Sequence, residues 1–116
     1  MSKSVIVKAN GEIETKNLDT LASLQDAVGG HIEAIALINK ELGYASGYVN
    51  EEGKLNGLPI NKLATMIWMF VNGYKELHDV LVGDVIFTGE VDEEGNTRDI
   101  SDAYVKFIYN FNEFIK

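Results

Sequence analysis

The chain has 116 residues, the length of one domain, and its 18 acidic and 10 basic side chains give a formal net charge of −8. The acidity, together with a single arginine at Arg98, disfavours direct binding to a nucleic-acid backbone or an anionic membrane. The absence of cysteine excludes disulfides, thiolate catalysis and cysteine-ligated metal. We therefore expect one acidic domain, residues 1–116, located in the cytoplasm.

The N-terminal residues predict a β-hairpin. Residues 4–9 are rich in β-branched side chains, which favour a strand. Asn10-Gly11 predicts a two-residue type I′ turn, in which both central residues have positive φ. A return strand is expected over residues 12–16, where acidic and apolar side chains alternate.

Three helices are predicted from apolar side chains that recur at helical spacing. The apolar stripes are Leu18, Leu21, Leu24 and Val28, then Leu63, Ile67, Phe70 and Tyr74, and finally Tyr104, Ile108, Phe111 and Ile115. The expected caps, whose side chains accept a hydrogen bond from a free backbone N–H, are Asp19 or Thr20, then Asn61, and Ser101 or Asp99. Gly29-Gly30 is expected to end the first helix in the left-handed conformation.

Further strands are predicted between and after the first two helices. Residues 31–38 are apolar on both faces apart from Glu33, a pattern that predicts a central strand covered on both sides. A second strand is expected over 44–50 and a buried strand over 80–88. The order of elements indicates an α+β fold, a single small domain with a mainly antiparallel sheet of about five strands and about three helices.

Two acidic turns, over residues 50–54 and 92–96, resemble each other. In both, the glycine, Gly53 or Gly95, is expected to take the left-handed position of a bulged hairpin. Neither turn has the alternating oxygen ligands of a calcium loop, so solvated turn carboxylates are the favoured interpretation.

The segment that leads into the second helix is the best candidate for a small-ligand site. Backbone N–H groups between Gly57 and Asn61 can meet an anion at a helix start, and Lys54 and Lys62 lie near them in sequence. Glu33 is added to this set because no turn or cap accounts for it. The alternative is that these residues only start the helix.

The second helix carries a candidate interface made of Met66, Trp68, Met69 and Phe70. Methionine packs adaptably and tryptophan is enriched at protein interfaces. The alternative is that these side chains belong to a buried core helix.

No catalytic or metal-binding pattern is found. His31, Glu33 and His78 lack the spacing of a metal site, and no serine lies in a nucleophile elbow. We therefore expect no metal, no cofactor and no enzymatic activity.

Three strings of residues resemble one family. They are residues 24–33, 50–55 and 57–61, and they fit the pattern V-G-G-x-I-E followed by N-E-E-G-K-L-x-G-L-P-x-N. This pattern resembles an uncharacterised family of small proteins from bacteriophages, plasmids and Gram-positive bacterial genomes. The resemblance spans residues 21–89, implies a phage or mobile-element setting, and assigns no catalytic residue.

Two functions remain open from the sequence. The first is a non-enzymatic phage or mobile-element accessory protein that binds a host protein in the host cytoplasm, with counter-defence as one purpose. The second is a protein that binds a small ligand or a nucleotide signal. A homo-oligomer formed through the second or third helix is compatible with either function.

Overall fold

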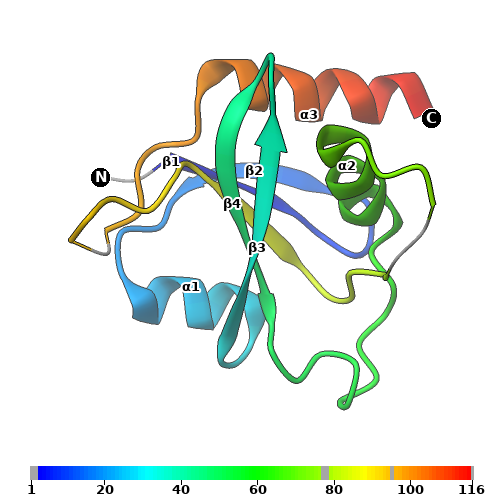
Figure 1. Ribbon diagram of the computed structural model, residues 1–116. Coiled ribbons are helices and arrows are strands. Elements are labelled where there is room, and N and C mark those ends of the chain that lie inside the picture. The colour runs from blue at the N-terminus through cyan, green and yellow to red at the C-terminus, as the bar shows by residue number, and fades with distance from the viewer. Residues whose placement is uncertain (1–2, 77–78, 95, 116) are drawn as a thin grey trace.

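The computed structural model describes residues 3–76, 79–94 and 96–115, which contain two strand pairs, one single strand and three helices. In chain order they are β1 (Lys3–Val7), β2 (Ile13–Asn17), α1 (Leu21–Val28), β3 (Ile32–Asn39), β4 (Gly43–Asn50), α2 (Lys62–Asn72), β5 (Val85–Thr88) and α3 (Asp102–Ile115). The strands form one antiparallel sheet in the order β2-β1-β5-β4-β3 (Figure 1). The predicted α+β fold with five strands and three helices is confirmed. No described helix is long and apolar enough to cross a membrane.

The two faces of the sheet are covered by different helices (Figure 1). On one face, α2 and α3 pack on alternate residues of the strands, including Val5, Val85 and Phe87. On the other face, α1 packs on Ile6 and Ile86, which are the intervening residues. This alternation follows from the two-residue period of a strand, and it makes the central strand β5 fully buried.

The predicted helix ends at α1 and α3 are confirmed. The hydroxyl of Thr20 accepts a hydrogen bond from the N–H of Ser23 at 3.1 Å, and Gly29 ends α1 with φ of 81°. The hydroxyl of Ser101 accepts from the N–H of Tyr104 at 3.2 Å at the start of α3. Each contact satisfies a backbone group that the helix itself leaves unpaired.

The second helix is shorter than predicted. Its apolar stripe was expected to include Tyr74, whereas α2 ends at Asn72, because Gly73 takes the left-handed conformation with φ of 69°.

The hairpin between β1 and β2 is real, but its predicted type I′ turn is wrong. Gly11 has φ of 94°, whereas no described non-glycine residue, Asn10 included, has positive φ. The N–H of Gly11 donates to the carbonyl of Lys8 at 2.9 Å, and the N–H of Lys8 donates to the carbonyl of Glu12 at 2.8 Å. These bonds define a longer loop with a glycine bulge, in which one left-handed residue is enough.

Gly53 does not take the predicted left-handed position, because it is not among the glycines with positive φ. It does not close a hairpin either, since the chain runs from β4 into α2. A Cβ at this position would lie 2.8 Å from Cγ2 of Val82, so the glycine permits a close approach of two segments. The matching prediction for Gly95 lies outside the described residues.

Two strand predictions need correction. The strand predicted as central over 31–38 is the edge strand β3, since its apolar side chains are covered by α2 on one face while Ala34, Ala36 and Ile38 on the other face are exposed. The strand predicted over 80–88 is the shorter strand β5, which begins only at Val85 and ends at Thr88. Gly83, with φ of 74°, interrupts the extended backbone before it.

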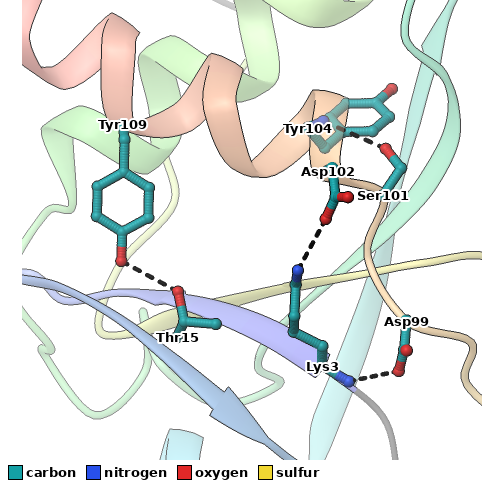
Figure 2. A network of polar contacts seen from close by, with 7 residues as sticks. All are labelled: Lys3, Thr15, Asp99, Ser101, Asp102, Tyr104 and Tyr109. Atoms are coloured by element: carbon teal, nitrogen blue, oxygen red, sulfur yellow. Dashed lines mark hydrogen bonds and ion pairs between the residues drawn. The ribbon is translucent and has the colours of Figure 1, made fainter.

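Polar contacts join α3 and the residues just before it to the first hairpin (Figure 2). The ammonium of Lys3 pairs with the carboxylate of Asp102 at 2.9 Å, and the backbone N–H of Lys3 donates to Asp99 at 2.6 Å. The hydroxyls of Thr15 and Tyr109 are hydrogen-bonded at 3.1 Å. The hydrogen bond and ion pair with Lys3 hold the pKa of Asp102 below its usual value.

Candidate functional site

A small pocket opens between β3, β4, α2 and the segment that precedes β5. Its volume is about 110 Å³, enough for a side-chain terminus or a few water molecules. It is lined by Glu33, Ile35, Val49, Asn50, Glu51, Lys54, Trp68, Asp79, Val80, Leu81 and Val82. The lining therefore combines residues from four segments that are distant in sequence.

Carboxylates outnumber the basic groups of this pocket. Glu33, Glu51 and Asp79 contribute three formal negative charges and Lys54 contributes one positive charge, so the sum is −3 + 1 = −2. The Lys54 ammonium forms an ion pair with Asp79. The hydrogen bond from Lys54, followed by one from the N–H of Val80, holds the pKa of the Asp79 carboxyl below its usual value. A cation suits this pocket better than an anion does.

The aromatic wall of the pocket is Trp68, which is half-buried. Its ring meets the ring of Tyr74 edge-on, with centroids 5.7 Å apart and planes at 89°. An indole beside carboxylates is a favourable environment for an ammonium or guanidinium group.

The residues predicted to bind a ligand are only partly brought together. Glu33 and Lys54 both line the pocket, but Gly57, Asn61 and Lys62 do not. Gly57 and Lys62 are exposed, whereas Asn61 is 1% exposed.

Asn61 makes structural contacts with every polar atom of its side chain. Its amide donates to the carbonyls of Val7 and Gly83, each at 2.8 Å, and its amide oxygen accepts from the N–H of Ala64 at 3.0 Å. Its backbone N–H donates to the carbonyl of Leu81 at 2.8 Å. The predicted cap of α2 is thus confirmed, and these bonds account for Asn61 without a ligand.

The predicted interface residues of α2 point in two directions. Met66 is 42% exposed and Phe70 is 62% exposed, and they lie one turn apart on the outer side of the helix. Trp68 and Met69 are half-buried. The interpretation of α2 as a purely buried core helix therefore fails at Met66 and Phe70.

An exposed aromatic cluster forms where α2 meets α3. The ring of Phe70 stacks on Phe107 with centroids 5.7 Å apart and lies 5.4 Å from Phe111. Phe114, on the same side of α3, is 84% exposed. We call Met66, Phe70, Phe107, Phe111 and Phe114 the aromatic surface. A shallow groove then runs from Phe70 past the end of α2 to the turn between β3 and β4.

The groove ends at a polar contact that sequence reasoning missed. The side-chain amide of Asn72, the last residue of α2, accepts from the N–H of Ile38 at 2.7 Å and donates to the carbonyl of Ala36 at 3.0 Å. Both backbone groups belong to β3 and point away from β4. The only available signal was an amide side chain at the helix end. Because β3 was predicted to be central, no free backbone groups were expected on it for this amide to bind.

Histidine and carboxylate side chains do not gather into a metal site in the part of the chain that the structure describes. His31 lies beside the end of α1 at a separate surface hollow, and His78 lies outside the described residues.

Comparison with known proteins identifies a family. A search of curated proteins and a search of solved structures each returned no match. A family model described as a domain of unknown function, DUF3846, matches residues 1–112, which is longer than the resemblance found from the motifs. The chain therefore belongs to the DUF3846 family, and the expectation of an uncharacterised family is confirmed.

Proposed function

We propose that this protein is a non-enzymatic accessory protein of a phage or mobile element, and that it binds a host protein through the aromatic surface. The observation that carries the proposal is the exposure of Phe70 and Phe114, at 62% and 84%, beside the stacked rings of Phe107 and Phe111. Large apolar side chains that gather on a surface are typical of protein-binding sites. Phenylalanine and methionine are among the residues enriched at such interfaces.

Charge supports the same proposal. The net charge of −8 favours encounter with a basic protein surface, because complementary potentials raise association rates. The phage or mobile-element setting comes from the motif resemblance, which implies a bacterial host protein as the partner.

The alternative, a protein that binds a nucleotide signal, receives less support. The pocket that holds Glu33 and Lys54 has a formal sum of −2, which repels a phosphate group. Its volume of about 110 Å³ is also well below the ~300 Å³ at which ligand pockets usually begin. Thermal-shift screening against nucleotides tests this alternative, and a clear rise in melting temperature would favour it.

The test of the proposal is affinity capture from lysates of Gram-positive bacteria, followed by identification of the bound protein and measurement of its affinity in purified form. Phe70→Ser removes the most central ring of the aromatic surface, and we expect it to weaken binding by about tenfold or more. Leu55→Ser is the matched control, because Leu55 is 84% exposed and lies in the loop before α2.

The outcomes separate clearly. Binding that is lost in Phe70→Ser and retained in Leu55→Ser supports the proposal. Failure of the wild-type protein to retain any protein at low salt, or equal binding by both variants, would overturn it.

A further inference from the structure

The outer edge of β3 is a sheet edge that is only half covered. Glu33, Ile35 and Leu37 pair with β4, and the N–H of Glu51 donates to the carbonyl of His31 in the same register. In an antiparallel ladder, backbone groups of alternate residues face opposite sides. The N–H and C=O groups of Ala34, and the N–H of Ala36, therefore point away from the sheet.

At the other half of this edge, a side chain makes the hydrogen bonds that a neighbouring strand would make. The amide of Asn72 accepts from the N–H of Ile38 and donates to the carbonyl of Ala36. These are the two bonds that a neighbouring strand would make there. No described residue makes the corresponding bonds to Ala34, which is exposed. Open edges of this kind accept an added strand, and natural proteins usually protect them.

The surroundings of the open edge are acidic. Glu33 and Ile35 belong to the strand itself and also line the pocket whose formal sum is −2. Because side chains of paired strands lie side by side on the same face, an added strand would place alternate side chains over this pocket. A lysine or arginine there would meet the carboxylates of Glu33 and Glu51 and the ring of Trp68.

From these contacts we infer that the Ala34–Ala36 edge of β3 binds an extended, basic segment of a partner protein, which adds to the sheet as a sixth strand. This inference rests on the proposed function and names the partner's chemistry. The main-chain bonds supply affinity, and the pocket selects a basic side chain at the position of the added strand that faces it. The face beside Ala34 and Ala36 accepts apolar side chains, because both alanines are small and exposed.

A second copy of this chain fits the edge less well than a basic segment. Each copy carries −8, so a pair would bring two strongly negative molecules together. Edge-to-edge pairing would also bring a second Glu33 carboxylate into the same region, and like charges close to one another are destabilising.

The experiment uses purified full-length protein and a synthetic peptide in which lysine and valine alternate. Amide chemical shifts and hydrogen-exchange protection report where the peptide binds. We expect the N–H groups of Ala34 and Ala36 to become protected. A peptide with glutamate in place of lysine should bind at least about tenfold more weakly, and the difference should shrink at high salt.

Two protein variants test the two parts of the inference. Ala34→Pro removes an outward N–H without removing a bond to β4, and we expect it to abolish peptide binding. Glu33→Lys reverses one charge of the pocket and should weaken binding by about tenfold. Glu41→Lys is the matched control, because it makes the same charge change in the exposed turn at the other end of β3.

A peptide with N-methyl groups at alternate residues gives the same test on the wild-type protein, should Ala34→Pro fail to fold. Loss of binding on methylation supports the inference. Absence of protection at Ala34 and Ala36, or equal binding of the lysine and glutamate peptides, overturns it. Dimerisation that is seen by sedimentation and lost in Ala34→Pro also overturns it, because a second copy then occupies the edge.

Failure of this inference can be told from failure of the proposed function. A host protein that is retained by Ala34→Pro and lost by Phe70→Ser leaves the proposed function standing and removes the strand-addition model. Failure to capture any partner counts against the proposed function. The peptide experiment tests separately whether the Ala34–Ala36 edge binds an added strand.

Discussion

Asn61 offers the sharpest test of how the three segments around α2 are held together. Its side chain is 1% exposed and links β1 through Val7, the turn before β5 through Gly83, and the first turn of α2 through Ala64. Asn61→Ala removes all three hydrogen bonds. At about 1 kcal/mol for each bond, we expect a loss of about 3 kcal/mol, which is a large part of a domain's total stability of roughly 5–15 kcal/mol.

Asn61→Asp separates the cap from the two donated bonds. One carboxylate oxygen still accepts from the N–H of Ala64. The other oxygen replaces the amide nitrogen, which donates to the carbonyls of Val7 and Gly83 at 2.8 Å, so it faces two carbonyl oxygens without a proton to donate. The buried carboxyl should stay protonated in the folded state, so its folded pKa lies above the ordinary value of about 3.9. The favourable field at the start of α2 offsets this only in part.

The sign of the pH dependence follows from linkage. Between the unfolded and the folded pKa the folded state binds more protons, so the stability of Asn61→Asp falls as pH rises, by up to about 1.4 kcal/mol per pH unit. We therefore expect Asn61→Asp to be more stable than Asn61→Ala near pH 4 and less stable near pH 7.

Urea denaturation of both variants at these two pH values measures the effect. Asn56→Ala is the control, because Asn56 is exposed in the loop before α2. The reasoning is refuted if Asn61→Ala loses less than about 1 kcal/mol, or if the gap between Asn61→Asp and wild type is the same at both pH values.

Three further predictions follow from other parts of the chain. Gly89→Ala should lower the free energy of unfolding by about 1–3 kcal/mol, because the new Cβ would overlap the backbone carbonyl of Asp99; an unchanged thermal midpoint would contradict this packing. Ser4→Ala should leave stability unchanged or raise it by up to about 1 kcal/mol, since the Ser4 hydroxyl is buried without a described partner; a clear loss in urea denaturation would indicate a missing partner. Lys54→Met should raise the pKa of the Asp79 carboxyl toward its ordinary value, as measured by NMR titration. The ion pair stabilises the folded state at pH values above the unfolded pKa of Asp79, and this stabilisation is lost as pH falls through the folded pKa. The variant should therefore lose no more than about 0.5 kcal/mol of unfolding free energy at pH 7, and nothing near pH 2. An unchanged Asp79 pKa in Lys54→Met would refute the role of the pair.

The helix ends were predictable because their signals are local. Thr20, Gly29 and Ser101 act on backbone groups only a few residues away, so the chain need not be folded around them to show their roles. The Asn61 cap was predictable for the same reason, because it acts on the N–H of Ala64 only three residues away. The two hydrogen bonds that Asn61 donates to distant carbonyls were not predictable from local sequence.

The location of the pocket could be predicted only in part. Glu33 and Lys54 were nominated because turns and caps did not explain Glu33 and because Lys54 precedes a helix. Asp79, the partner of Lys54, lies 25 residues further along the chain, and no local pattern connects the two. The indole of Trp68 was assigned to an interface stripe of α2, whereas in the fold it forms the wall of the pocket.

The amino-acid sequence by itself determined the acidic charge, the starts of the helices, the first β-hairpin and the α+β class, because each depends on composition or on residues that are near neighbours. Only the tertiary structure decided that β3 is an edge strand, that Asn72 covers half of that edge, and that α2 and α3 bring their phenylalanines together. The physical reason is that strand order and helix docking depend on which distant surfaces bury most apolar area together, and an apolar pattern within one segment does not reveal its partner.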